Sequence, residues 1–284
     1  MEKVLTPRTL LLTALAMLAF AGNSLLCRLA LKTTQIDAVT FTSVRLLSGA
    51  LMLWVLLRLR NRSAPMAGNL ASAAALFVYA AAFSYAYLHL DAGAGALLLF
   101  GAVQISMLVV GFARGERANL QQGIGFVLAL AGVIALMLPG ASAPPLVGGG
   151  LMLLAGVAWG AYSLLGRGVK DPLAASAGNF LRAIPFAILL TLVFIQRLDW
   201  DTPGLIYALL SGALTSGVGY FIWYSALPGL SAFQAASVQL SVPILAALAG
   251  AVLLSESISA RLVMASVAVL GGIALVLRAK TRPR

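Results

Sequence analysis

The chain has 284 residues, 61% of them hydrophobic and only 10% charged, and its formal net charge is +11. This is more apolar surface than a water-soluble domain of this length could bury, so the composition predicts an integral membrane protein in contact with the lipid bilayer. Nucleic-acid binding is not expected, because Lys and Arg stand in short clusters between apolar runs and do not form one basic face.

Ten apolar runs follow one another along the chain, separated by charged clusters and by Gly or Pro turns. They cover residues 10–31, 38–57, 70–88, 92–112, 120–138, 146–165, 173–195, 205–227, 230–254 and 262–277. Most have the roughly 20 residues that a transmembrane helix needs. The first run begins like a signal peptide but has no convincing cleavage site, so we expect it to remain as a helix. The predicted fold class is an all-α integral membrane protein with ten transmembrane helices.

The basic residues of the connections predict the orientation. If the N-terminus is cytoplasmic, the cytoplasmic segments contain thirteen of the 19 Lys and Arg residues: Lys3, Arg8, Arg58, Arg60, Arg62, Arg114, Arg117, Arg167, Lys170, Arg278, Lys280, Arg282 and Arg284. The other side has Lys32, Arg197 and Arg261, with Arg28 just inside the end of the first helix. Because Lys and Arg are enriched in cytoplasmic loops, we expect both termini to be cytoplasmic.

The two halves of the chain are related in sequence at an offset of 139 residues. The string Ser24-Leu-Leu-Cys-Arg28 recurs as Ser163-Leu-Leu-Gly-Arg167, Val103-Gln-Ile105 as Val242-Pro-Ile244, and Ile134-Ala-Leu-Met-Leu138 as Ile273-Ala-Leu-Val-Leu277. Residues 1–139 and 140–284 are therefore predicted to be two five-helix repeats. Because five crossings reverse the side of entry, the second repeat is inverted, which is the architecture of many secondary transporters.

The acidic residues all fall in connections or at the ends of the apolar runs. They are Glu2, Asp37, Asp91, Glu116, Asp171, Asp199, Asp201 and Glu256. A carrier that exchanges protons for a cation usually needs a carboxylate within the membrane. The sequence therefore argues against cation/proton antiport and favours a facilitative uniporter.

The chain has few of the residue types that usually form catalytic or metal centres. Its only histidine, His89, lies at a predicted turn beside Asp91, and its only cysteine is Cys27. We therefore expect no metal site, no Ser-His-Asp hydrolase and no cofactor. An intramembrane lipid-modifying enzyme would need paired mid-membrane acids or a buried nucleophile with a base, and the sequence shows neither.

Two arginines, Arg45 and Arg182, are predicted to lie about seven and nine residues inside their helices. A buried guanidinium is costly unless it has partners, so each should face the bundle interior or water. Two roles remain open for them. They could bind a carboxylate of the substrate, or they could bond to helix-end carbonyls and hold the scaffold together.

Polar and aromatic side chains inside the spans form a candidate substrate-binding set: Asn23, Tyr79, Phe83, Tyr87, Phe100, Gln104, Trp159, Tyr162, Trp223 and Gln239. Tyr79, Phe83 and Tyr87 recur at a spacing of four, so they share one helix face. Such groups suit a wet, aromatic-walled cavity for a zwitterion with an apolar side chain. The alternative for each aromatic residue is helix packing or an interfacial belt.

Several of these features occur together in a known family. An arginine in the second helix of each half, Arg45 and Arg182, a glutamate after the fourth, Glu116 and Glu256, and glycine-rich fifth and tenth helices resemble the EamA branch of the drug/metabolite transporter superfamily. The resemblance implies a transporter of a small-molecule substrate and not an enzyme. Within the family the chain looks most similar to bacterial exporters of the YddG type, which carry amino acids out of the cell across the inner membrane.

Export of another organic solute, such as a drug or a nucleotide-sugar, is the alternative. The sparse basic residues of the predicted lining weigh against multiply phosphorylated substrates, which need several Arg or Lys contacts. The sequence does not indicate an oligomeric state.

Overall fold

A computed structural model describes residues 6–62, 65–113, 120–140, 143–166, 169–226, 229–230 and 238–278, without the side chains of residues 112, 224, 277 and 278. The first repeat contains α1 (Pro7–Thr33), α2 (Ala38–Arg60), α3 (Leu70–Tyr87), α4 (Ala92–Ala113) and α5 (Leu120–Met137). The second contains α6 (Leu146–Leu165), α7 (Pro172–Val193), η1 (Ile195–Arg197), α8 (Thr202–Leu210), η2 (Ser211–Val218), α9 (Gly219–Ala226), α11 (Ser241–Leu254) and α12 (Ala260–Arg278).

The helices match the number and type that the sequence predicts. Eight spans are long and apolar enough to cross a membrane, and α8, η2 and α9 together form one of them. The shorter apolar helices α11 and α12 complete the ten. Large apolar side chains cover the outside of the bundle; Leu59, Leu120 and Val252, for example, are 79–81% exposed. An apolar outer surface of this kind is suited to lipid.

Aspartates begin three of the helices. Asp37 accepts hydrogen bonds from the backbone N–H groups of Val39 and Thr40 at the start of α2, at 2.7 and 3.1 Å. Asp171 caps α7 and Asp201 caps α8 in the same way. A carboxylate at this position satisfies backbone donors that the first helical turn leaves free. These acids therefore hold helix ends.

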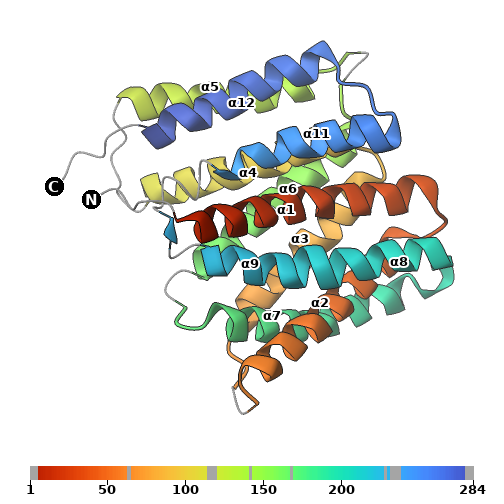
Figure 1. The fold of residues 1–284 in the computed structure, drawn as a ribbon. Coiled ribbons are helices and arrows are strands. Elements are labelled where there is room, and N and C mark those ends of the chain that lie inside the picture. The colour runs from red at the N-terminus through yellow and green to blue at the C-terminus, as the bar shows by residue number, and fades with distance from the viewer. Residues whose placement is uncertain are drawn as a thin grey trace.

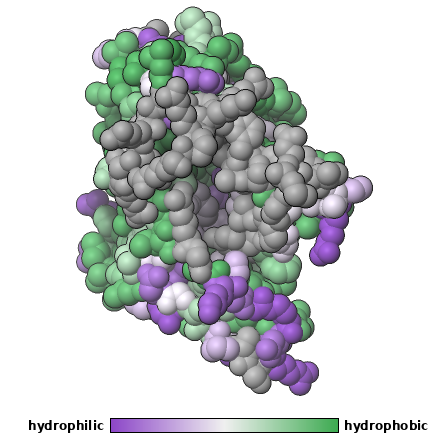
Figure 2. Space-filling view, turned by 90° about the vertical axis from the view of Figure 1, so that its left-hand side faces the viewer, coloured by the Kyte–Doolittle hydropathy of each residue, from purple (hydrophilic) through white to green (hydrophobic). Residues whose placement is uncertain are grey.

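Asp171 also joins the ends of two helices from different repeats. It forms an ion pair with Arg60 at the end of α2. The hydrogen bond from Arg60 lowers the pKa of the Asp171 carboxyl group below its usual value. Figure 2 views the molecule from the end where the termini lie, and hydrophilic residues gather in its lower part, where α2 ends in Figure 1.

The helix contacts follow the two-fold relation of inverted repeats. α3 and α4 both pack on α6, and their counterparts in the second repeat, α9 and α11, both pack on α1. Three further close pairs join equivalent helices: α2 with α7, α4 with α11 and α5 with α12. In addition, α2 packs on η2 and, in the equivalent arrangement, α7 packs on α3. Figure 1 shows α5 and α12 together at one edge of the bundle and α2 and α7 at the other. The middle of the bundle is thus formed by helices of both repeats.

Glycines allow the closest approaches between the repeats. In the α5–α12 pair, a Cβ atom on Gly125 would lie 2.5 Å from the carbonyl oxygen of Gly272, and the reverse distance is the same. In the pair of α2 and η2, a Cβ atom on Gly212 would lie 2.0 Å from Ser48 Oγ and 2.2 Å from the backbone oxygen of Arg45. Both positions therefore require glycine for the helices to meet as they do.

We predict that Gly212→Ala destabilises the protein by about 1–3 kcal/mol, because the added methyl group would overlap backbone that cannot shift locally. The thermal unfolding midpoint of the purified protein in detergent should fall. Gly150→Ala is the matched control, because a Cβ atom there meets nothing within 4 Å. Equal midpoints for the two variants would contradict the packing of η2 on α2.

Candidate functional site

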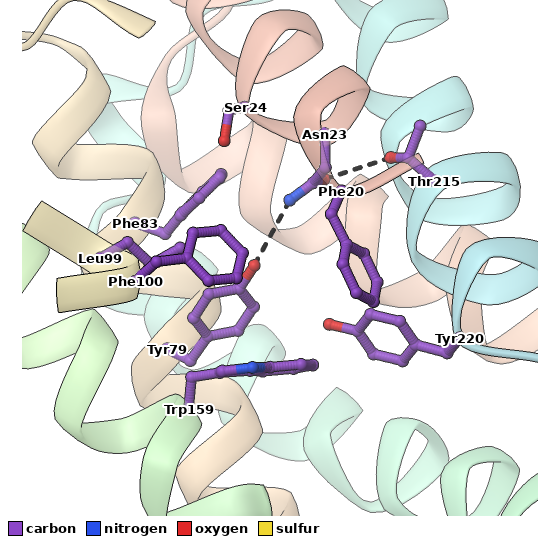
Figure 3. A pocket seen from close by; sticks show the side chains of 10 residues that line it. All are labelled: Phe20, Asn23, Ser24, Tyr79, Phe83, Leu99, Phe100, Trp159, Thr215 and Tyr220. Carbon is purple, nitrogen blue, oxygen red and sulfur yellow. Dashed lines mark hydrogen bonds between the residues drawn. The ribbon is translucent and has the colours of Figure 1, made fainter. Parts of the chain in front are cut away.

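A cavity lies between helices of the two repeats (Figure 3). Its lining consists of Phe20, Asn23, Ser24, Tyr79, Phe83, Leu99, Phe100, Trp159, Thr215 and Tyr220, from α1, α3, α4, α6, η2 and α9. The space open to the centres of water molecules is about 20 Å³, which is room for about one or two waters. The walls must therefore separate before a solute the size of an amino acid can enter.

One wall of the cavity is a buried network of amide and hydroxyl groups. Asn23 is 6% exposed, and its Nδ2 donates to the hydroxyl oxygen of Tyr79 at 3.3 Å. Its Oδ1 accepts hydrogen bonds from Ser211 at 2.8 Å and Thr215 at 3.2 Å. Figure 3 shows the Asn23 amide between Tyr79 and Thr215. This network links α1 and α3 of the first repeat to η2 of the second.

The network depends on the π-helical conformation of η2. A π-helix closes its turns between residues five apart, so its side chains at positions i, i+4 and i+5 lie close together. Ser211, Thr215 and Ser216 have this spacing, and they bond to Asn23 and Arg45. Short π-helical segments inside α-helices are frequent at functional sites.

Arg45 lies next to this polar wall. It is 2% exposed, and its Nη2 donates to the Tyr79 hydroxyl oxygen at 3.0 Å while its Nε donates to Ser216 at 3.3 Å. Its guanidinium carbon is 5.1 Å from the centre of the Tyr79 ring and 4.9 Å from that of Phe83. Aromatic faces at such distances stabilise a desolvated cation. Its Nη1 has no hydrogen-bond partner among the described residues.

The other walls are aromatic. The ring of Trp159 lies 4.9 Å from that of Tyr79 and 5.1 Å from that of Tyr220, and Phe20 meets Tyr220 edge-on at 6.1 Å. Figure 3 shows Phe20, Tyr220 and Trp159 on the side away from the Asn23–Thr215 contact. Rings packed at these distances fill the cavity in this conformation.

The structure brings half of the candidate set to the cavity. Asn23, Tyr79, Phe83, Phe100 and Trp159 line it. Tyr162, Tyr87 and Trp223 form a second layer, each in ring contact with a lining residue: Tyr162 with Trp159, Tyr87 with Phe83, and Trp223 with Phe20. Gln104, buried on α4, and Gln239, half-buried before α11, are not among the lining residues.

Arg182 does not lie in a buried site, in contrast to the sequence expectation. Its side chain is exposed, and its Nη1 donates to the backbone oxygens of Ala67 at 2.7 Å and Gly178 at 3.0 Å. The physical reason is the path of the α2–α3 connection, which runs along α7 and bonds to it through Ala67 and Asn69. Irregular backbone at this position needs donors for its carbonyl groups. Arg182 therefore bonds to the α2–α3 connection and is not among the residues that line the cavity.

Sequence reasoning missed the contribution of η2 to the site, and on α9 it selected Trp223 but not Tyr220. Ser211, Thr215, Ser216 and Tyr220 are not in the candidate set. The spacing of four between Ser211 and Thr215, which places both on one helix face, was a usable signal.

A second group of charged side chains, two of them buried, joins helices at one end of the bundle. Arg28 near the end of α1 donates from Nε to Glu256 at 2.9 Å, from Nη2 to Asp91 at 3.1 Å and from Nη1 to the backbone oxygen of Tyr87 at 2.8 Å. The side chains of Arg28 and Glu256 are only 11% and 5% exposed. We call Arg28, Asp91 and Glu256 the end network. It joins α1 and the α3–α4 turn to the connection between α11 and α12.

The backbone before Glu256 is held in an uncommon conformation. Ser255 has a φ of 53°, a left-handed value that few residues other than glycine adopt. The turn directs the Glu256 carboxylate to the backbone N–H of Ala92 at 2.8 Å as well as to Arg28. Strain of this kind persists where surrounding contacts fix it. Glu116, the corresponding glutamate of the first repeat, lies outside the described residues.

The chain is similar to known proteins over nearly its whole length. It is 69% identical to an uncharacterized protein of Pseudomonas aeruginosa, over 95% of this chain and 94% of the relative. It is 26% identical to an uncharacterized transporter of Archaeoglobus fulgidus, over 85% of this chain and 87% of the relative. A solved crystal structure matches 94% of this chain and 96% of its own with a TM-score of 0.67 at 17% identity, which shows a shared fold.

The similarity also reflects the internal repeat. The family model described as the EamA-like transporter family matches the chain twice, at residues 7–138 and at residues 146–278. Each match covers five of the ten apolar spans described above. The chain therefore belongs to the EamA-like transporter family.

Proposed function

We propose that this transporter exports small amino acids and related metabolites as a facilitative uniporter. The observation that carries the proposal is the cavity between the two repeats, which has an amide and hydroxyl wall on one side and aromatic rings on the other. Ligand sites are commonly apolar cavities with a few convergent polar groups. In transporters built from inverted repeats they lie at the repeat interface.

The two kinds of wall suit the two parts of an amino acid. The polar wall around Asn23 and Tyr79 offers hydrogen bonds to a charged head group. The rings of Trp159, Tyr220 and Phe20 offer faces for an aliphatic side chain, and aromatic faces also attract ammonium groups. A small zwitterion can therefore be bound without an acidic residue in the lining.

The positions of the acids support uniport. Within the described residues, Asp37, Asp171 and Asp201 cap helices, and Asp91 and Glu256 pair with Arg28. Proton coupling needs a group whose protonation changes with the state of the carrier. The lining of the cavity contains no carboxylate or histidine among the residues that the structure describes. The gradient of the solute itself would then set the direction of transport.

Alternating access would require the end network to open. Removing one partner of a buried ion pair costs about 3–5 kcal/mol because the other charge is left buried, so the closed state of that end needs both Arg28 and Glu256. We propose that the repeats 1–139 and 140–284 move relative to each other about the cavity, and that Arg28 separates from Glu256 when the site faces that side. The ring contacts around Trp159 would separate in the same movement.

A second candidate is export of another small organic solute, such as a drug. The observation that favours it is the carbon-rich lining, in which Phe20, Phe83, Leu99 and Phe100 stand beside Trp159 and two tyrosines. A mainly apolar solute could use these faces with few hydrogen bonds. An enzymatic activity is not part of the proposal.

We further propose that the protein lies in the bacterial inner membrane with both termini cytoplasmic, so that the end network faces the periplasm. The excess of Lys and Arg in the connections at the other end supports this orientation. A reporter that is active only in the periplasm should give no signal when it is fused to the C-terminus. The same reporter inserted after Trp200 should be active, and the reverse pattern would contradict the orientation.

The uniport proposal predicts the behaviour of the purified protein in liposomes. Vesicles loaded with labelled alanine should release it down its gradient without an imposed pH gradient, because no proton needs to cross with the solute. A proton ionophore should leave the rate unchanged. Uphill accumulation of alanine driven by a pH gradient would show that a peripheral carboxylate titrates during transport, and uniport would be wrong.

The end network predicts a change in access to the cavity. Ser24 lines the cavity and lies one turn from Arg28 on α1, so Ser24→Cys in a Cys27→Ala background reports access from that end. Adding Glu256→Gln should speed labelling by a membrane-impermeant thiol reagent, about tenfold for each 1.4 kcal/mol by which the closed state is weakened.

Lys32→Gln is the control for this measurement. Lys32 lies 3.6 Å from the same carboxylate but is 35% exposed, so removing its charge should change labelling little. Equal labelling rates with and without Glu256→Gln would show that the network does not control this end.

A further inference from the structure

The polar wall of the cavity has more hydrogen-bond donors than acceptors. The Tyr79 hydroxyl oxygen accepts from both Asn23 and Arg45, and no acceptor for its own hydrogen occurs among the described residues. Asn23 uses one N–H for Tyr79, while its Oδ1 already accepts from two hydroxyl groups. Arg45 Nη1 has no partner in the described part of the chain.

The same place has a surplus of positive charge. Each ion pair that the structure describes involves Arg28, Lys32 or Arg60 and none involves Arg45. Buried donors and buried charges normally have partners, since water is not there to replace them. The oxygen and nitrogen of the Asn23 amide could be exchanged in their assignment. The surplus of donors and of positive charge would remain, because Arg45 Nη1 would still have no acceptor and no counter-charge. What the site lacks is a group with a negative charge and acceptor oxygens.

We propose that this wall is a carboxylate subsite, in which Tyr79 and Asn23 donate hydrogen bonds to a carboxylate of the solute and Arg45 supplies the opposite charge. The proposal rests on the proposed function in taking the cavity as the path of the solute. Tyr79 lines the cavity and is bonded to Arg45, so it connects the charge to the space that the solute enters. Arg45 acts through Tyr79 and is a positioning residue.

The subsite is expected to select a group that carries a single negative charge. A single guanidinium matches a monocarboxylate, whereas phosphate groups with more charge are usually held by several Arg or Lys side chains. Amines without a carboxylate would meet unpaired donors and the field of Arg45 and would be rejected. The carrier is therefore expected to distinguish an acid from its neutral amide of nearly the same size.

The test compares two acid and amide pairs, alanine with alaninamide and propionate with propionamide. Each compound is measured by its thermal stabilisation of the purified full-length protein, and alanine and alaninamide also by competition with labelled alanine in liposomes. Each acid should act at about 10- to 100-fold lower concentration than its amide, the range expected for hydrogen bonds to a charged group. Equal effects of an acid and its amide, including no effect of either, would overturn the proposal.

Two substitutions of the same chemical kind locate the subsite. Tyr79→Phe should remove most of the preference for the acid, because it deletes the donor and keeps the ring. Tyr162→Phe should keep the preference, since that hydroxyl is bonded to Asn179 at 3.5 Å and does not line the cavity. Arg45→Lys should retain part of the preference and Arg45→Gln should lose it. If Arg45→Gln does not fold, Tyr79→Phe alone tests the location of the subsite. A preference for the acid that is retained in Tyr79→Phe would overturn the assignment.

The outcomes separate this inference from the proposed function. If labelled alanine does not cross the membrane but propionate stabilises the protein far more than propionamide, the subsite stands and amino-acid export fails. If alanine crosses and alaninamide competes equally well, export stands and the subsite fails.

Discussion

The charge of Arg45, enclosed in a helix bundle that lies in lipid, is the constraint on which the arrangement of the site depends. A guanidinium in this setting persists only where oxygen atoms and aromatic faces replace its hydration. Tyr79 and Ser216 provide the oxygens, and the rings of Tyr79 and Phe83 provide the faces. Because these groups come from α3 and η2, satisfying the charge also brings the two repeats together around the cavity. The Nη1 group of Arg45 has no hydrogen-bond acceptor among the described residues, so the site can bind one more acceptor.

The scaffold is two-fold related, but the site is not. Counted from the aspartates that cap α2 and α7, the counterpart of Arg45 is Asn179 and not Arg182. Asn179 is buried too, but it bonds to Tyr162 of its own repeat and to the backbone N–H of Asn69 in the α2–α3 connection, and it is not among the residues that line the cavity. The π-helical segment η2 adds hydroxyl groups to the side of the cavity where Arg45 lies. The repeats thus share their packing and divide the binding groups unequally.

The fold could be predicted from the sequence to a greater depth than the site. Ten spans and an inverted repeat follow from hydropathy and from the offset of 139, because lipid admits few alternatives to spanning helices. Asn23, Tyr79 and Trp159 could be selected as costly polar or large aromatic groups within spans. The spacing of Ser211 and Thr215 places them on one helix face, but the π-helical turn that adds Ser216 to this group has no signature in composition. The pairing of Arg28 with Glu256 joins residues 228 positions apart in the chain, and hydropathy contains no information about such contacts.

A continuous stack of side chains connects the cavity to the end network. Tyr79 packs on Phe83 at 5.3 Å between ring centres, and Phe83 packs on Tyr87 at 4.8 Å. The backbone oxygen of Tyr87 then accepts a hydrogen bond from Arg28, which holds Glu256. These aromatic residues lie one turn apart on a single face of α3, so each ring packs on the next along the helix. Under the proposed function, a solute that displaces Tyr79 would act on α3, and the far end of this helix is one hydrogen bond from the Arg28–Glu256 ion pair. Coupling of this kind would run through packing contacts and would not need a titrating group between the cavity and the end network.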